Sequence, residues 1–249
     1  MSNSDLVQSF LMPELGSNDV IAFSDLNPEV AVINFSSMNP GKFERWKWFH
    51  DKPLIDRRAL YVFLKDDEQH YYIGTEEVPT FKRYESIINT LLDQHCIPLN
   101  RVVSIGSSMG GYASLLFAFK LRFAASICVN PQVDLQSAKL HELELWSRKI
   151  KETGSLWEDL DAVVASCDAD PVVYLRTSEY AADVSAADRL EAALRKKSSM
   201  LVRHFDRVSK HGWLGPNSSS INVTISSLLS LATTRDVNSA TATAGAEID

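Results

Sequence analysis

Several residue types that signal unusual architectures are scarce in this 249-residue sequence. Its three cysteines, Cys96, Cys128 and Cys167, are far apart and form no CxxC pair, so a zinc site is not expected. Ten glycines and nine prolines are too few for a fibrous or low-complexity chain. No apolar run approaches the roughly eighteen residues that a membrane span requires. These absences favour an ordinary globular fold without a metal centre.

Positive charge is also scarce. Lysine and arginine total 25 against 32 acidic residues, which gives a formal net charge of −7 and a pI near 5.4. The chain therefore lacks the basic excess with which proteins neutralise nucleic-acid phosphates, and its charge disfavours adsorption to anionic membranes. The first residues contain no basic segment followed by a sustained apolar one, so no secretory signal is expected. We therefore expect a cytoplasmic protein that binds neither nucleic acid nor membrane.

What the sequence does contain is an alternation of short apolar, β-branched runs with helical patterns. This alternation is typical of an α/β fold with a mostly parallel sheet flanked by helices. Thr80 and Ser185 are expected to cap two of the helices. The expected strands are 20–23, 30–35, 59–64, 71–73, 101–105, 124–129, 172–176 and 200–205. The expected helices are 81–95, 111–121, 138–151, 156–165, 186–196 and 219–231.

The pattern predicts one domain over residues 1–232, with a small helical insertion at about 135–168. Residues 233–249 are small and polar without periodicity, which predicts a disordered tail. The segment 39–56 gathers Trp46 and Trp48 among basic residues. Two readings of this segment stand equally: the wall of a substrate pocket, or an aromatic-rich surface loop.

A G-x-S-x-G motif lies between the expected strand 101–105 and the helix that follows it. In such a turn the nucleophile is pushed into the cleft, and side chains two residues before and after it would collide with it. Gly106 and Gly110 meet that requirement around Ser108, and Gly111 permits close packing as the helix begins. Ser107 has no such glycine frame. The motif in this context predicts a nucleophilic serine at Ser108.

A serine hydroxyl needs a base to take its proton and an acid to orient that base. In the chain order Ser, acid, His, the histidines after the acid region are His204 and His211. His204 lies within an expected strand, whereas His211 follows the last strand in a loop, so His211 is the candidate base. Glu179 and Asp183 both follow the strand 172–176 and are both candidate acids. Spacing does not separate them, and we prefer Glu179 narrowly.

The tetrahedral intermediate also needs backbone N–H donors. One is expected at Met109, directly after the nucleophile. The second is expected in the loop after the strand 30–35, at Ser36 or Ser37, with Ser37 preferred. No metal or cofactor is expected.

Four segments carry a wider resemblance: VINFSSMNPGKF, LYVFLKDDEQHYYIG, RVVSIGSSMGGYASLLFA and ICVNPQVDL. With these segments the chain resembles the α/β-hydrolase superfamily over nearly its whole length. More narrowly, it resembles hydrolase-like proteins encoded with bacterial surface-polysaccharide and accessory-secretion genes. The resemblance implies an eight-stranded sheet, a Ser-acid-His triad and no cofactor. The acid loop, LRTSEYAADV, departs from the superfamily's usual glycine-then-aspartate pattern, which leaves the acid open. Only short helices follow the NPQ segment, so a minimal lid is expected.

Three functions follow from this reading. The first is a serine esterase or deacylase that acts through an acyl-enzyme on a small-molecule or glycan ester. The second is an acyltransferase in which a sugar hydroxyl replaces water, as in O-acetylation. The third is a non-catalytic binding or assembly module that kept the fold, because fold alone does not establish function. Whether the protein forms a homo-oligomer is left open by the sequence.

Overall fold

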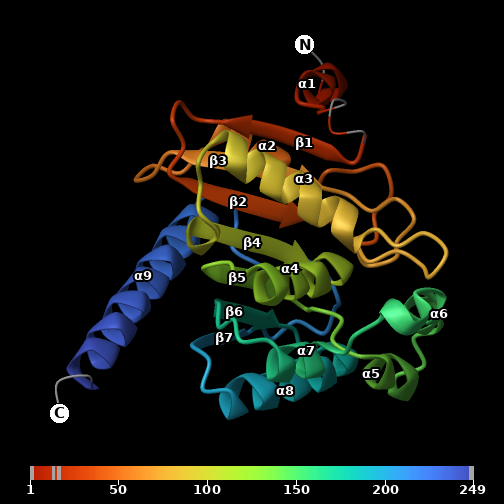
Figure 1. Cartoon of the computed structure of the whole chain (residues 1–249). Helices are drawn as coiled ribbons and strands as arrows, with labels where there is room; N and C mark the ends of the chain where they lie inside the picture. The colour runs from red at the N-terminus through yellow and green to blue at the C-terminus, as the bar shows by residue number, and fades with distance from the viewer. Residues whose placement is uncertain (1–2, 13–14, 16–17, 247–249) are drawn as a thin grey trace.

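A single seven-stranded sheet forms the centre of the computed structural model, which describes residues 3–12, 15 and 18–246 (Figure 1). The strand order is β1-β3-β2-β4-β5-β6-β7; β1 is antiparallel to β3, and all other pairs are parallel. The strands are β1 (Val20–Ser24), β2 (Val30–Phe35), β3 (Ala59–Leu64), β4 (Val102–Ser107), β5 (Ala125–Val129), β6 (Val172–Thr177) and β7 (Leu201–Phe205).

Helices cover both faces of the sheet. They are α1 (Asn3–Ser9), α2 (Trp46–Asp51), α3 (Phe81–Gln94), α4 (Met109–Leu121), α5 (Leu135–Leu140), α6 (Glu144–Glu152), α7 (Leu160–Ser166), α8 (Ala181–Lys196) and α9 (Ser220–Ala246). Alternate residues of β2 belong to two different core clusters, one on each face. One cluster includes side chains of α3, α4, α7 and α8, and the other includes side chains of α2 and α9.

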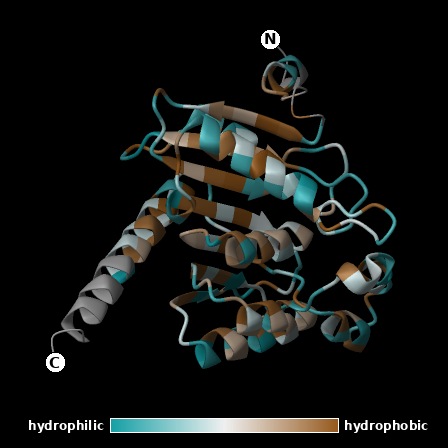
Figure 2. Cartoon of the chain, in the orientation of Figure 1, coloured by the Kyte–Doolittle hydropathy of each residue, from teal (hydrophilic) through white to brown (hydrophobic). Residues whose placement is uncertain are grey.

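This double coverage explains the sequence pattern of the central strands. Every residue of β2, β3 and β4 is buried, and parallel strands buried on both faces read as near-continuous apolar runs. Figure 2 shows the hydrophobic residues gathered on the sheet and the hydrophilic residues on the connecting loops. The expected α/β class, a mostly parallel sheet flanked by helices, is confirmed. Among the described helices, none combines the length and hydrophobicity needed to cross a bilayer.

The expected strand 71–73 is wrong, and the described sheet therefore has seven strands rather than eight. The segment is a turn in which Tyr71 and Tyr72 adopt positive φ angles of 58° and 63°. Both residues are buried, and the Tyr72 hydroxyl donates to the carbonyl oxygens of Ser36 (2.9 Å) and Leu64 (3.1 Å). The apolar character that favoured a strand comes from packing of the rings inside a turn.

Helix boundaries differ from expectation where the local signal was ambiguous. The expected helix 138–151 is two helices, α5 and α6, because the chain turns through Glu142, which has φ 54°. The expected helix 156–165 is a short 3₁₀ turn at Gly154–Leu156 followed by α7. Both α1 and α2 were not expected. Thr80 does precede α3, but its side chain makes no capping hydrogen bond.

The start of α8 matters most for the site. This helix begins at Ala181, so Ser185 lies inside it and is not its cap. The capping-box pattern was misleading because AADVSAAD is itself a good helix-forming sequence that continues toward the N-terminus. As a result Asp183 lies in the first turn of a helix rather than in a loop.

The predicted ends of the domain can be compared with the structure only where the terminal residues are described. Helix α9 continues to Ala246, so most of the expected tail 233–249 is helical in the structure. Residues 247–249, like 1–2, 13–14 and 16–17, lie outside the described residues. The single domain over 1–232 remains a prediction. The insertion expected at about 135–168 corresponds to α5, α6 and α7, of which α5 and α6 lie toward the carboxyl ends of the strands (Figure 1).

Candidate active site

Ser108 occupies a strained turn between β4 and α4. Its backbone has φ 55° and ψ −122°, a conformation that non-glycine residues rarely adopt and that tends to occur at functional sites. A Cβ at position 106 would lie 1.9 Å from the carbonyl oxygen of Gly110, and one at position 110 would lie 2.3 Å from that of Phe35. Only glycine fits at either position. The turn thus has the backbone geometry that the motif predicts for a nucleophile elbow.

Asp183 and His211 form a close pair. Asp183 Oδ1 lies 2.6 Å from His211 Nδ1, and its other oxygen, Oδ2, accepts a hydrogen bond of 2.7 Å from the Ser178 hydroxyl. Asp183 is only 2% exposed. A buried carboxylate in this position holds the imidazole in the tautomer that carries its proton on Nδ1, which leaves Nε2 free to accept a proton.

Glu179, the acid narrowly preferred from sequence, is placed differently. It is exposed, and its backbone N–H donates to the carbonyl oxygen of Val208 at 2.9 Å. The structure brings Asp183, and not Glu179, into contact with His211.

Ser108 and His211 line one small pocket of about 260 Å³. His211 Nε2 is buried and makes no hydrogen bond within the part of the chain that the structure describes. That atom is therefore available to a serine hydroxyl or to a substrate. The pocket is lined by Ser37, Met38, Glu44, Arg45, Ser107, Ser108, Leu145, Trp146, His211, Gly212 and Trp213.

The loop after β2 separates the two candidates for the second oxyanion donor. The Ser36 N–H donates to the carbonyl oxygen of Leu64 at 3.0 Å, so it is occupied by the sheet. Ser37 lines the pocket beside Ser108. Met109 is the first residue of α4, where a backbone N–H has no acceptor within the helix. Of the two candidates in this loop, Ser37 therefore lies at the pocket, while the Ser36 N–H is already used; the roles of Ser37 and Met109 as donors stay predictions.

A buried ion pair fastens this loop to the sheet. Arg45 Nη2 lies 2.9 Å from Glu44 Oε2. The same nitrogen donates to the carbonyl oxygen of Phe35 at 3.1 Å, and Arg45 Nε donates to Asn34 Oδ1 at 2.8 Å. Glu44 in turn accepts a hydrogen bond from the Ser37 hydroxyl. Burial lowers the pKa of the Arg45 guanidinium, and the neighbouring Glu44 carboxylate opposes that shift. The pair therefore sets the position of the Ser37 backbone.

The profile of the prolyl oligopeptidase family matches residues 76–221, more than half of the chain and all of the elbow. The chain belongs to this family. Membership confirms the expected class, a serine hydrolase or acyltransferase of the α/β-hydrolase type. No curated protein matches the sequence.

Solved structures of other proteins share the fold at low identity. The capsule O-acetyltransferase of Neisseria meningitidis serogroup A is 14% identical, with a TM-score of 0.60 over 86% of this chain and 92% of the other. Esterase B from Lactobacillus rhamnosis is 11% identical, with a TM-score of 0.64 over 94% and 93%. A chain of the Gap123 glycosylation-associated complex from Streptococcus agalactiae is 16% identical, with a TM-score of 0.57 over 84% and 43%.

Aromatic rings border the pocket that Ser108 and His211 line. The Trp146 ring, carried by α6, lies 4.5 Å from the His211 ring. The Trp213 ring lies 4.3 Å from the Arg45 guanidinium and 5.8 Å from the Trp48 ring. Both readings of the segment 39–56 stay predictions. Its residues Glu44 and Arg45 wall the pocket, whereas Trp46 packs into the core.

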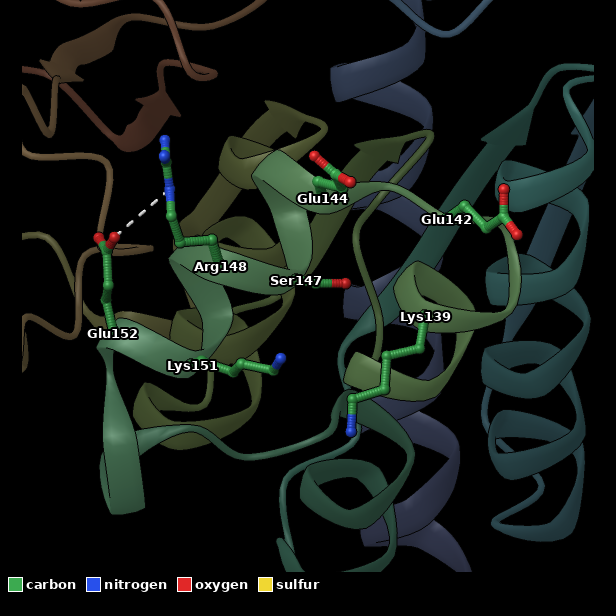
Figure 3. A pocket seen from close by; sticks show the side chains of 7 residues that line it. All are labelled: Lys139, Glu142, Glu144, Ser147, Arg148, Lys151 and Glu152. Atoms are coloured by element: carbon green, nitrogen blue, oxygen red, sulfur yellow. Dashed lines mark ion pairs between the residues drawn. The ribbon is translucent and has the colours of Figure 1, made fainter.

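A larger hollow, of about 650 Å³, lies on the α5–α6 face. Figure 3 shows that its side chains carry charges of both signs and spread apart rather than converge on one point; Arg148 and Glu152 pair with each other at 3.6 Å. It contains neither a histidine nor a residue of the elbow. The chemistry of the chain therefore points to the smaller pocket.

Some residues at the site were not expected from sequence. Trp146 and Ser178 are separated from the motif by long stretches of chain and match no spacing rule. Trp213 could have been noticed, because it lies two residues after the candidate base in SKHGW. His204 lies on β7 with its side chain half exposed and pairs with Asp206 at 3.4 Å, as its place in a strand predicted.

Proposed function

We propose that this protein is a serine esterase in which Ser108 is the nucleophile, His211 the base and Asp183 the acid. One observation carries the proposal. A buried Asp183–His211 pair leaves Nε2 of the imidazole without a partner at the pocket that Ser108 also lines. Asp183 replaces Glu179 as the preferred acid because Asp183 alone of the two contacts the histidine.

The reaction follows from this arrangement. Ser108 Oγ attacks the ester carbonyl carbon and gives its proton to His211 Nε2, while the Met109 and Ser37 amides stabilise the oxyanion. Collapse of the intermediate breaks the ester bond, and His211 protonates the departing alcohol. Water then attacks the acyl-enzyme, loses its proton to His211, and releases the carboxylic acid and free Ser108.

The pocket supports a small acyl group. About 260 Å³ lies near the lower end of ligand-site volumes and does not hold a long acyl chain. The rings of Trp146 and Trp213 at its border suit an alcohol with a flat apolar face, such as a sugar. This feature supports the second candidate function, acyl transfer to a sugar hydroxyl, which differs only in the acceptor that resolves the acyl-enzyme. Two of the structural neighbours, a capsule O-acetyltransferase and an esterase, are named for these two outcomes.

The first experiment is labelling with a fluorophosphonate probe. Wild-type protein should be labelled, and both Ser108→Ala and His211→Ala should abolish labelling while remaining folded by circular dichroism. Ser107→Ala is the matched control, because Ser107 lines the same pocket but is not the serine at the centre of the glycine frame. No labelling of folded wild type, or labelling that survives in Ser108→Ala, would refute the proposal and favour a binding module.

A second experiment separates hydrolysis from transfer. The protein is acylated with p-nitrophenyl acetate, and the release of acetate is compared with acetyl transfer to added oligosaccharides by mass spectrometry. Acetate alone supports the esterase. Acetylated sugar, dependent on Trp213 in a Trp213→Ala comparison, supports the transferase.

A further inference from the structure

Asn130 connects the two segments that carry the acid and the base. It directly follows β5, is fully buried and adopts φ 44°, a left-handed conformation that asparagine tolerates better than most residues. Its Nδ2 donates to the carbonyl oxygen of Gly212 at 2.9 Å, and its Oδ1 accepts from the Ser178 N–H at 2.8 Å. One carboxamide thus holds both the residue after His211 and the loop before Asp183.

Ser178 completes the connection to the acid. It is fully buried after β6, and its hydroxyl oxygen accepts a hydrogen bond of 3.1 Å from the Tyr180 N–H at the start of α8. Because that interaction occupies a lone pair, the hydroxyl proton is directed to Asp183 Oδ2, 2.7 Å away. The contacts form a closed ring from Asn130 through Ser178, Asp183 and His211 to Gly212 and back to Asn130.

The segment of His211 needs such a connection. The chain between β7 and α9 forms no helix or strand, and Gly212 within it has φ 155°, which side-chain-bearing residues rarely adopt. A loop of this kind has many accessible conformations, and catalysis by a base depends on its position to within about 1 Å. The Asn130 carboxamide fixes the chain one residue from the imidazole.

We propose that Asn130 and Ser178 are positioning residues that hold the Asp183–His211 pair in its productive geometry. Neither residue lines the pocket, so both act through other residues rather than on a substrate. The inference rests on the proposed function, because it assigns these two residues to the same site. Loss of either contact should lower the rate of attack by Ser108 without weakening the binding of a probe.

The test compares variants that remove one or both contacts of Asn130, or the side-chain contacts of Ser178. Asn130→Asp keeps the acceptor for Ser178 and removes the donor to Gly212, and Asn130→Gly removes both without straining the left-handed backbone. Ser178→Ala removes the hydroxyl that donates to Asp183 and accepts from the Tyr180 N–H, and it keeps the backbone N–H that donates to Asn130. Asn27→Gly is the matched control, because Asn27 is an exposed asparagine with φ 53° in a turn between β1 and β2.

Two readouts are measured on the full chain. In fluorophosphonate labelling, the maximal rate constant should fall about 10- to 100-fold in the three site variants, with the half-saturating probe concentration within about twofold of wild type. In proton NMR of protein labelled with ¹⁵N-histidine, the low-field Nδ1 proton shared with Asp183 should broaden or vanish. That resonance is assigned by its absence in His211→Gln. Asn27→Gly should leave both readouts unchanged.

The outcomes distinguish this inference from the proposed function. Site variants that only lower the melting temperature, with wild-type labelling rate and an unchanged His211 resonance, would overturn the positioning role. If folded wild type is not labelled but its His211 resonance is present and is lost in Asn130→Asp, the esterase proposal fails and the positioning role stands. Should Asn130→Gly not fold, the near-isosteric Asn130→Asp and Ser178→Ala decide the question.

Discussion

Replacing Asp183 by asparagine should abolish most of the activity while leaving the fold nearly intact. The carboxylate uses both oxygens as acceptors, one for His211 Nδ1 and one for the Ser178 hydroxyl. Asparagine has one oxygen and one NH₂ group. If its NH₂ faces His211, it donates to Nδ1, and the imidazole proton moves to Nε2, where it blocks proton transfer from Ser108. If its oxygen faces His211, the Ser178 hydroxyl loses its acceptor and faces an N–H donor.

The expected size of the loss follows from charge and tautomer. Two unit charges about 4 Å apart interact by about 4 kcal/mol at an effective dielectric constant of about 20, which corresponds to about 10³ in rate. The wrong tautomer adds to this, and the equivalent change in serine proteases costs about 10⁴. We therefore expect a loss of about 10³–10⁴-fold in kcat/KM, or about 4–5.5 kcal/mol in the activation free energy.

The assay is p-nitrophenyl acetate hydrolysis together with the fluorophosphonate labelling rate, for Asp183→Asn and for the control Glu179→Gln. The control removes the other candidate carboxylate, which is exposed and does not contact His211, so it should stay within about threefold of wild type. A large loss in Glu179→Gln, or near-wild-type activity in folded Asp183→Asn, would refute the assignment of the acid.

Three further predictions concern the scaffold. Gly106→Ala should prevent folding or greatly lower the melting temperature in a thermal scan. The new Cβ would lie 1.9 Å from the Gly110 carbonyl oxygen, and only main-chain movement could relieve that clash. A soluble variant with the wild-type melting temperature would contradict this prediction. Phe117→Ala should lower the free energy of unfolding, measured in urea, by about 3–5 kcal/mol. The Phe117 ring is fully buried, with its centroid 4.6 Å from that of Phe81 and 5.0 Å from that of Phe35. A loss below about 1 kcal/mol would show that the core around Phe117 is not close-packed. Asp206→Asn should cost about 1.5–3 kcal/mol at neutral pH, because Arg176 hydrogen-bonds this carboxylate with two nitrogens and thereby lowers its pKa. A lowered pKa stabilises the folded state above the ordinary aspartate range, so the difference from wild type should shrink as the pH falls through that range, and a difference that is constant with pH would contradict this.

Much of the sheet could be predicted because its strands are buried on both faces. Runs such as VAVINF and ALYVFL leave no polar face, and a strand is the simplest structure for a run of six such residues. The elbow could be predicted for a different reason. Gly106 is required by a contact within the motif itself, with Gly110 only four positions away, although Gly110 is required by the more distant carbonyl oxygen of Phe35.

Features that depend on distant contacts could not be predicted in the same way. Tyr71 and Tyr72 form a buried turn because a hydroxyl reaches carbonyl oxygens of Ser36 and Leu64, and no local pattern encodes that contact. The acid was ambiguous because Glu179 and Asp183 differ by a single helical turn. Which of them meets His211 depends on where α8 begins, and a helix start is among the least certain features of a sequence.

The placement of the acid on the first turn of α8 also limits how the length of this chain can vary. The number of residues between the end of β6 at Thr177 and the acid at Asp183 is fixed, because Ser178 contacts both Asn130 and the acid itself. One inserted or deleted residue there would rotate Asp183 by about 100° around the helix and turn it away from the histidine. Helices α5 and α6 contain none of the residues of the hydrogen-bonded ring that links Asn130, Ser178, Asp183, His211 and Gly212. Natural variation in length, and any attempt to reshape the pocket by grafting a new lid, should therefore be confined to the β5–β6 connection.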